Sequence, residues 1–367
     1  MKALVVGGTG PTGPHLVRGL IRRGYEVAIF HRGTHESDEI PPQVEHIHGD
    51  PHFRETIDAA LQERSFDLVL ATYGRLRHIA ESLRGRAGRF IGVGGVAVYR
   101  GYKEPQRLFP QGMLIPTAEH DARVTADDEA AFSRLMTATE DAVFASHPTA
   151  TIFRYPYVYG PNQLIPREWS VIRRILDGRR QIPLPEGGLM LATHGYAENL
   201  AHAVLLAVDQ ADASAGQAYN CGDERTLTVR QLVEVIARRM EVSMEIVSVP
   251  NHVAVTSRAL TLREDLHHWV MDIGKIKRDL GYRDLVDPVD AIGRTVDWYL
   301  RHPPLRGGEI EQRLADSFDY EAEDRLIAIQ QAAVQQMLAA TRHAAGERRP
   351  HAYAHPRQPG ERDHRAR

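Results

Sequence analysis

Three glycines near the start of the chain have a spacing that could hold phosphate groups. Gly7, Gly10 and Gly13 follow an apolar run over 2–6 and precede a helical stretch over 14–23. Glycines at this spacing allow a tight turn, close approach of the backbone to a diphosphate and close helix–sheet contact, and the helix N-terminus adds unpaired N–H groups. The pattern predicts a dinucleotide-binding loop rather than a glycine turn without a ligand. The other contacts expected in this loop are Thr9, Pro11 and Thr12.

The residues after the second expected strand bear on which dinucleotide is bound. A dinucleotide fold normally places an acid there to hold the adenosine ribose hydroxyls of NAD. Here the strand 26–30 is followed by His31, Arg32 and Gly33, with no acid, and the planar guanidinium of Arg32 suits a 2′-phosphate. We therefore expect NADP, with NAD as the alternative, because Arg32 could equally be a surface residue or stack on adenine. Asp50 is expected to reach the adenine amino group, or else to cap the helix that follows it.

Short apolar runs alternate with helical stretches, which indicates an α/β fold with a doubly wound parallel sheet of the Rossmann type. Nearly uninterrupted apolar runs are typical of strands that are covered on both faces. Beyond residue 160, prolines and glycines break the chain more often. The expected strands are 2–6, 26–30, 45–48, 66–70, 89–93, 149–153 and 217–220, and the expected helices include 14–23, 127–146, 197–208, 228–240 and 318–342.

The 367 residues exceed the usual length of one domain, and we expect four parts. A dinucleotide-binding domain covers 1–160, with its sheet completed by later segments, and a smaller substrate-facing lobe covers 161–302. An extension with a helix covers 303–342. The tail 343–367 has no large aliphatic side chain and is rich in Arg and His. It cannot offset the entropy of ordering, so we expect it to be disordered.

Composition argues against several classes of protein. Lys and Arg total 45 against 48 Asp and Glu, a net charge of −3, so the chain lacks the bulk positive charge that holds nucleic acids, although the Arg-rich tail keeps that role open. The single Cys221 excludes an internal disulfide framework and a cysteine-rich zinc site. His46 and His48 could share a strand face, but no carboxylate or Cys accompanies them in the motif, so we predict no metal site.

The same composition bears on the location of the protein and on its binding partners. The apolar runs are shorter than the roughly 20 residues that cross a bilayer, and no signal peptide is expected. We therefore expect a cytoplasmic protein that binds a small-molecule substrate and no membrane, with a homodimer left open.

Four motifs along the chain carry a family resemblance. They are the glycine loop, the segment 154–161 that ends in Tyr-Gly-Pro, the segment 194–201, and Tyr-Asn-Cys-Gly at 219–222. Together they resemble the extended short-chain dehydrogenase/reductases, the group that contains nucleotide-sugar epimerases and dehydratases, over roughly residues 1–300. The resemblance implies a bound nicotinamide dinucleotide. Further cofactor contacts are expected from Thr72, Tyr155 and Pro156.

The resemblance fails at the family's catalytic positions. The family has a Ser or Thr shortly before a Val-Tyr pair, and here Gly95 precedes the pair that ends at Tyr99. The family then has a Tyr and a Lys four residues apart, followed by a Glu; with Glu140 as the anchor, Phe132 and Met136 stand in their places. In the family the Lys supports the Tyr, whose hydroxyl moves a proton as hydride moves to or from carbon. Phe and Met can do neither.

Three functions are compatible with this loss. The first is an atypical reductase that acts on a bulky or aromatic carbonyl compound, because positioning alone supplies much of the rate. The second is a catalytically silent module that senses cofactor or binds a partner. The third, an ordinary nucleotide-sugar epimerase or dehydratase, ranks lowest because it needs the missing proton shuttle. The intact glycine loop favours the enzyme, since it would be expected to decay without a dinucleotide.

A reductase of this kind takes its proton from water, from the substrate or from a substitute side chain. Each candidate also has a structural interpretation: Tyr99 lines the site in ordinary relatives, Thr72 and Tyr73 could simply hold cofactor, and His194 could be a hydrogen-bonded structural histidine. The candidate donors are Tyr99, Tyr73, Thr72, Tyr157 and His194.

Overall fold

The computed structural model describes residues 1–34, 37–125, 130–261, 266–342 and 358–362. The chain divides into two compact units, 1–319 and 320–367. The first unit contains every strand of the described chain, and the second contains α13 (Tyr320–Thr341). The segments expected to form the nucleotide domain and the substrate lobe therefore lie together in one unit.

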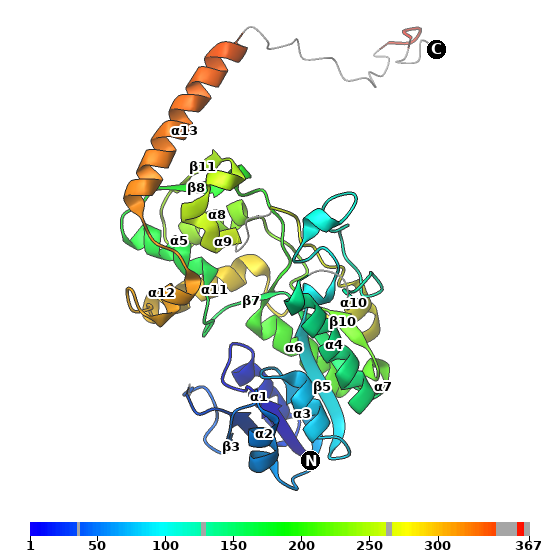
Figure 1. The fold of residues 1–367 in the computed structure, drawn as a ribbon. Helices are drawn as coiled ribbons and strands as arrows, with labels where there is room; N and C mark the ends of the chain where they lie inside the picture. The colour runs from blue at the N-terminus through cyan, green and yellow to red at the C-terminus, as the bar shows by residue number, and fades with distance from the viewer. Residues whose placement is uncertain (35–36, 126–129, 262–265, 343–357, 363–367) are drawn as a thin grey trace. The chain divides into compact units, whose positions relative to one another are not determined.

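The first unit is built on a parallel sheet of seven strands in the order β10-β6-β5-β4-β1-β2-β3 (Figure 1). Every neighbouring pair runs parallel, which confirms the predicted Rossmann-type α/β fold. The strand order reverses between β1 and β4, and such a switch point leaves a crevice at the carboxyl ends of the strands. The strands are β1 (Lys2–Val6), β2 (Glu26–His31), β3 (Glu45–His48), β4 (Phe66–Ala71), β5 (Ala87–Gly95), β6 (Thr151–Tyr155) and β10 (Ala218–Asn220).

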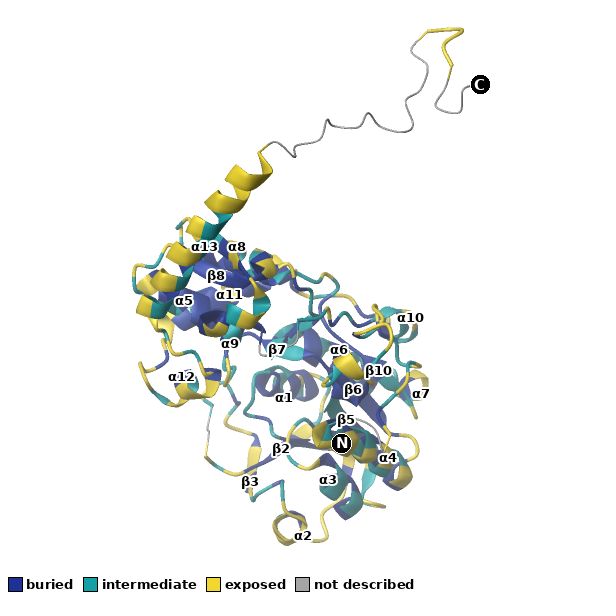
Figure 2. Ribbon diagram, turned by 45° about the horizontal axis from the view of Figure 1, so that its top comes forward, coloured by how far each residue is buried: buried dark blue, intermediate teal, exposed yellow. Residues whose placement is uncertain are grey.

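Helices cover both faces of this sheet. On one face α1 (Gly13–Arg22) packs with α6 (Ala197–Asp209), and the close approach leaves no room for a side chain at Gly19, whose Cβ would lie 2.3 Å from Leu205. The other face carries α2 (Arg54–Leu61), α3 (Leu76–Ser82) and α4 (Ala131–Ser146). Burial on both faces explains why the strands read as apolar runs, and Figure 2 draws β6 and β10 largely as buried.

A second core lies beyond the carboxyl edge of the sheet, around α5 (Arg167–Leu176) and α8 (Val229–Arg239). The pair β7 (Tyr157–Tyr159) and β9 (His194–Tyr196) connects it to the sheet, and its parallel register sets Tyr157 beside His194. The other elements are β8 (Gln181–Pro185), β11 (Glu245–Val249), α7 (Ala211–Ser214), α9 (Arg258–Thr261), α10 (Gly274–Leu280), α11 (Pro288–Arg301) and α12 (Glu309–Leu314).

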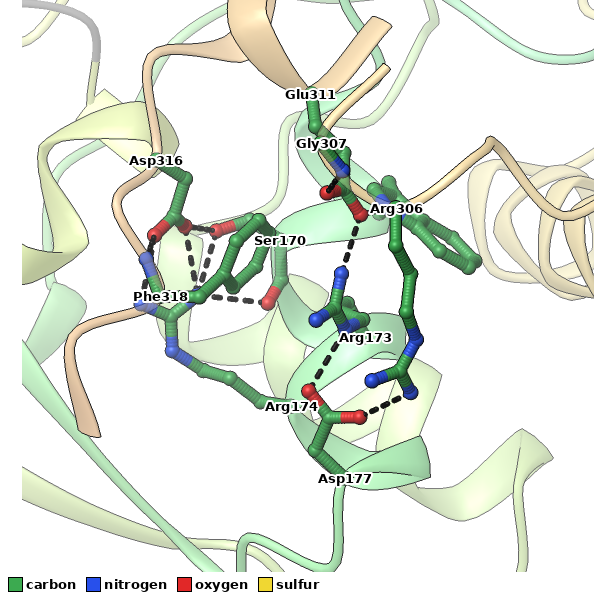
Figure 3. Close-up of polar contacts among 10 residues, drawn as sticks. Ser170, Arg173, Arg174, Asp177, Arg306, Gly307, Glu311, Asp316 and Phe318 are labelled. Carbon is green, nitrogen blue, oxygen red and sulfur yellow. Dashed lines mark hydrogen bonds and ion pairs between the residues drawn. The ribbon is translucent and has the colours of Figure 1, made fainter.

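Charged side chains fix α5 against the segment that follows α11 (Figure 3). Arg174 and Asp316 form a fully buried ion pair, with Nη1 2.7 Å from the carboxylate oxygen and both side chains 0% exposed. Arg173 reaches Glu311 at 2.6 Å. Charges removed from water are tolerated only when they are paired. The position of α5, and of its first residue Arg167, is therefore set by this cluster.

Most expected elements are present, with shifted ends. The helix at 197–208 is α6, and the predicted Thr228 cap is part of a capping box in which Thr228 and Gln231 bond reciprocally. The strand expected at 149–153 is found two residues later, as β6. The expected disorder of the tail falls mainly on 343–357 and 363–367, outside the described residues. Among the described residues, no helix is both long and apolar enough to span a bilayer.

Candidate functional site

A cavity of about 430 Å³ opens at the carboxyl ends of β1, β2 and β4. This is where open parallel sheets bind their ligands. The end of α1 also faces it through Thr12, so the positive end of a helix dipole is directed at the cavity. The predicted cofactor residues that line it are Gly7, Thr9, Gly10, Pro11, Thr12, His31, Arg32, Gly33, Thr72 and Tyr155.

The three glycines of the loop are needed for different reasons. Gly7 has φ +93°, and a Cβ there would lie 2.3 Å from the Cβ of Tyr73. A Cβ on Gly13 would lie 2.0 Å from the carbonyl oxygen of Gly8. A Cβ on Gly10 would meet nothing nearer than 3.8 Å, so the protein's own packing does not require this glycine. It leaves space on the cavity side of the loop, which fits a diphosphate against the backbone.

The adenosine end expected from the sequence holds Arg32 and three imidazoles. His31 ends β2, and the register of β2 with β3 sets it opposite His48. Nε2 of His31 lies 3.1 Å from Nδ1 of His46, and the backbone N–H of Gly33 donates to Nδ1 of His31 at 3.2 Å. One nitrogen from each of the three rings lies within 4.8 Å of the others. As possible metal ligands, the sequence indicated only His46 and His48, because the third ring comes from the neighbouring strand.

Three predicted cofactor residues lie outside the lining of this cavity. The carboxylate of Asp50 accepts the backbone N–H of His52 at 2.9 Å and lies 2.7 Å from its ring nitrogen. The adenine contact of Asp50 stays a prediction. Its alternative role as a helix cap is wrong, because α2 begins at Arg54 with Phe53 as its N-cap. Gly13 is buried in the first turn of α1. Pro156 faces a different cavity.

The cover of the cavity was not anticipated from the sequence. Four of its residues come from the loop after β7 and from α12, at positions outside the motifs, while Thr34 and Tyr73 follow β2 and β4 and Val158 lies in the motif 154–161. These additional lining residues are Thr34, Tyr73, Val158, Asn162, Gln163, Leu164 and Arg313. Of these, the sequence indicated Tyr73, as a candidate proton donor or a cofactor contact, and Val158 as part of the motif 154–161.

A second, small cavity of about 30 Å³ adjoins the first. The segment 155–158 separates them: Tyr155 and Val158 line the larger cavity, whereas Pro156 and Tyr157 line the smaller one. A volume of this size has room for about two water molecules. Its other walls are mostly apolar and aromatic, and include Val96, Tyr102, Met190, Trp269 and Met271.

Tyr99 is held in a buried polar network. Its hydroxyl donates to Oδ1 of Asn220 at 2.7 Å and accepts from Arg154, also at 2.7 Å. Arg154 in turn makes a two-pronged contact with Glu140 on α4, at 2.9 Å to each oxygen. Burial raises the pKa of Tyr99 to about 12. Protein groups thus take up both hydrogen bonds of the hydroxyl. Tyr99 is not among the described residues that line either cavity.

Two of the other hydroxyl candidates, Thr72 and Tyr157, also donate hydrogen bonds to the protein backbone. Thr72 donates to the carbonyl oxygen of Val6 at 2.9 Å. Tyr73 is 43% exposed, and the guanidinium carbon of Arg32 lies 5.8 Å from the centre of its ring. Both positions line the larger cavity, which is compatible with cofactor contacts. The hydroxyl of Tyr157 donates to the carbonyl oxygen of Ile165 at 2.5 Å.

His194 faces the smaller cavity as a neutral ring. Burial lowers its pKa to about 3, and the charge of Arg167 acts in the same direction. Its Nε2 accepts from Nη1 of Arg167 at 3.3 Å. The guanidinium of Arg167 also lies 3.8 Å from the centre of the Tyr157 ring. At neutral pH the imidazole therefore orients a cation and carries no charge of its own.

The positions aligned above with the family's catalytic residues carry no group that can transfer a proton. A Cβ on Gly95 would lie 3.3 Å from the terminal methyl of Met136. Phe132 is 54% exposed, and the ammonium of Lys103 lies 5.2 Å from the centre of its ring. Lys103 comes from the loop after β5, and no spacing in the sequence indicated it.

Similarity to known proteins agrees with this architecture. The model of the NAD dependent epimerase/dehydratase family matches residues 3–91 and 130–222. The chain is 26% identical over 65% of its length to the chloroplast stem-loop binding protein of 41 kDa b of Arabidopsis thaliana, and the match spans 62% of that relative. It is also 26% identical to a 3-diazoavenalumate denitrifying reductase of a Streptomyces species, over 57% of this chain and 72% of the reductase.

Solved structures show the same fold. UDP-glucose 4-epimerase of Thermotoga maritima superposes with a TM-score of 0.66 at 18% identity, covering 83% of this chain and all of the epimerase. An enzyme of Bordetella bronchiseptica in complex with NAD+ superposes with a TM-score of 0.64 at 16% identity, covering 83% of this chain and 99% of that enzyme. With the glycine loop, the strand order and the matched segments in agreement, this chain belongs to the NAD dependent epimerase/dehydratase family.

Proposed function

We propose that the protein is an atypical NADP(H)-dependent reductase of this family, which reduces a carbonyl group in a bulky or aromatic small molecule. The observation that carries the proposal is the contrast between the larger cavity and the positions that hold the family's catalytic residues. The larger cavity keeps the loop, the helix end and the open side of Gly10 that a dinucleotide needs. Beside it, Gly95, Phe132 and Met136 lack the groups that move protons in the family.

The chemistry assigned to the cofactor is hydride delivery to the carbonyl carbon, while a proton reaches the carbonyl oxygen. The chain's own contribution is binding and alignment. The glycine loop and the start of α1 hold the diphosphate, and Tyr155 and Val158 form another part of the wall of the same cavity. Correct alignment can supply a large part of the rate. With Tyr99, Thr72 and Tyr157 engaged by protein partners, we assign the proton to water or to the substrate.

The preference for NADP is supported by the groups around the adenosine end. Arg32 lines the cavity, and its guanidinium can form two parallel hydrogen bonds to a 2′-phosphate. His31 lines the same wall, with His46 and His48 beside it. No carboxylate follows β2 directly in His31-Arg32-Gly33, so nothing in that turn would repel a phosphate.

A silent module that binds cofactor is the second candidate. It is favoured by the hydrogen bonds that engage the hydroxyls of Tyr99, Thr72 and Tyr157 within the protein. A nucleotide-sugar epimerase ranks third, since that reaction needs the proton shuttle twice. The stem-loop binding named for one relative is not carried over, because the net charge of −3 provides no bulk attraction for RNA.

Replacing Arg32 tests the cofactor assignment. Arg32→Asp removes the proposed phosphate contact and supplies an acid for ribose hydroxyls, so we expect the ratio of NADPH to NADH affinity to fall by about tenfold or more. Nicotinamide fluorescence titrations measure both affinities. Arg22→Asp, an equal charge change at an exposed site on α1, is the control and should leave the ratio unchanged. An unchanged ratio in Arg32→Asp would show that the phosphate contact is assigned wrongly.

A further inference from the structure

Three imidazoles meet near the carboxyl ends of β2 and β3, the last two strands at one edge of the sheet. One ring nitrogen from each of His31, His46 and His48 lies within 4.8 Å of the other two. The strand register pairs His31 with His48, and Ile47 between the two histidines of β3 is buried in the core. Because side chains alternate along a strand, His46 and His48 both lie on the side opposite Ile47. The pairing of β2 with β3 therefore brings the three rings together.

The spacing of the rings fits a metal ion held by nitrogen. Nε2 of His31 and Nδ1 of His46 are 3.1 Å apart, close to the roughly 3.3 Å that separates two nitrogens on a tetrahedral Zn²⁺. The centre of the His31 ring lies 5.0 Å from the centres of both the His46 and the His48 rings. Three imidazoles on Zn²⁺ leave a fourth coordination position for water or another ligand.

The ligand atoms and their burial select the kind of ion and give it a way in. Imidazole nitrogens suit Zn²⁺ and related transition metals, whereas Mg²⁺ and Ca²⁺ prefer oxygen ligands. Within the part of the chain that the structure describes, no carboxylate oxygen belongs to this group of ligand atoms. His31 is 4% exposed, whereas His46 and His48 are exposed on β3, an edge strand that is largely exposed (Figure 2). An ion can therefore reach the two outer rings directly from solvent.

Existing hydrogen bonds and charges set the cost of binding an ion. The backbone N–H of Gly33 donates to Nδ1 of His31 at 3.2 Å, which places the proton of the neutral ring on Nε2, facing His46. A metal on Nε2 requires this proton to move to Nδ1, and the N–H of Gly33 then loses its acceptor. Gly33 is only partly buried, so water can replace that acceptor. The adjacent Arg32 is exposed, so solvent screens its charge, and both costs lower the affinity without preventing coordination.

We propose that His31, His46 and His48 form a binding site for Zn²⁺ at the edge of the sheet. The sequence prediction of no metal site considered His46 and His48 alone, and β2 supplies the third ligand. The bound ion links β2 to the edge strand β3 and steadies the turn that carries Arg32 in the wall of the larger cavity. The proposal is independent of the reaction assigned above, because metal binding requires neither a dinucleotide nor a substrate.

The test titrates Zn²⁺ into the full chain, without a polyhistidine tag or dinucleotide, in competition with a chromophoric chelator. We expect one Zn²⁺ per chain to bind more tightly than any further ion. His46→Gln and His48→Gln should each weaken this binding by about tenfold or more, because each variant removes one ligand. His120→Gln, at a side chain that is 87% exposed, is the control and should leave the affinity unchanged.

Three results would overturn the inference: no stoichiometric Zn²⁺ binding, an unchanged affinity in either His46→Gln or His48→Gln, or displacement of Zn²⁺ by an equal concentration of Mg²⁺. Both variants replace exposed side chains, and urea unfolding checks that they are folded. If one is not, the other decides, together with thermal unfolding, in which Zn²⁺ should raise the midpoint of the wild type more than that of the variant. Failure of NADPH to bind counts against the proposed function alone and leaves the zinc result standing.

Discussion

Residues of one type serve different purposes in the glycine loop, and spacing alone does not separate them. Gly7 adopts a left-handed backbone conformation against Tyr73, and Gly13 touches the backbone of Gly8. Gly10 instead faces open space. The sequence predicts that all three matter, because the pattern is that of a dinucleotide loop. The structure explains Gly7 and Gly13 by packing, whereas Gly10 leaves open space that the proposed dinucleotide would use.

Matched alanine variants test this division. Gly10→Ala should change the free energy of unfolding by less than about 0.5 kcal/mol, yet weaken NADPH binding by about tenfold, because the methyl group occupies the ligand's space. Gly13→Ala should cost about 1–3 kcal/mol of stability, since its Cβ would overlap the Gly8 carbonyl. Urea unfolding and nicotinamide fluorescence measure the two effects. Equal losses of stability in both variants would contradict the assignment.

The buried Glu168 should make stability depend on pH. Burial raises its pKa from 4.5 to about 7, so the folded state keeps a proton that the unfolded chain releases over this range. The contribution of Glu168 to stability is complete below pH 4.5 and is lost as the pH rises through 7. Glu168→Gln cannot ionise, so its free energy of unfolding relative to the wild type should increase by on the order of 3 kcal/mol between pH 5 and pH 8.

Glu311 provides a control, because its pKa is shifted in the opposite direction from that of Glu168. Although burial alone would raise the pKa of Glu311, hydrogen bonds from Gly307, Trp169 and Arg173 hold it below its usual value. The contribution of Glu311 to stability is therefore complete above pH 4.5 and is lost as the pH falls below that value, so the stability difference between Glu311→Gln and the wild type should stay constant between pH 5 and pH 8. Urea unfolding at pH 5, 6.5 and 8 compares the variants. A pH-independent difference for Glu168→Gln would show that this carboxyl is ionised normally in the folded protein.

Among the elements, α5 depends most on distant charges. The side chains of its Arg174 and of Asp316 are both 0% exposed, so removing one partner leaves a bare charge in the interior. Asp316→Ala should cost about 3–5 kcal/mol. Arg294→Ala breaks the exposed pair with Glu198 at 3.4 Å and should cost less than about 1 kcal/mol. Thermal and urea unfolding compare the two, and equally small losses would contradict an anchoring role for the Arg174–Asp316 pair.

The elements also show how far the sequence can predict the site. Apolar runs located the strands, but β6 lies two residues beyond its run, because its ends are set by pairing with β5 from Ile91↔Thr151 to Gly95↔Tyr155. Tyr157 and His194 were named singly, and only the β7–β9 register brings them together. Arg167 was missed, since an arginine at the start of a helix has no pattern that distinguishes a buried position from an exposed one.

At the scale of the whole molecule, residues 1–319 form one compact unit that carries both cavities. The family fold is kept along with its dinucleotide cavity, while its catalytic positions hold Gly95, Phe132 and Met136. Cofactor binding and proton transfer depend on different residues, so one can persist without the other. The central proposal is that hydride transfer continues in a cavity that positions its substrate but does not protonate it.

Transfer of deuterium from 4-deuterated NADPH to a panel of aromatic aldehydes and ketones, with and without a carboxylate, tests this proposal most directly. Mass spectrometry of the alcohol products should detect one deuterium on the former carbonyl carbon, and Tyr99→Phe should transfer it at an undiminished rate. The account is contradicted if NADPH does not bind and no panel member gains deuterium, or if transfer disappears in Tyr99→Phe while the variant stays folded.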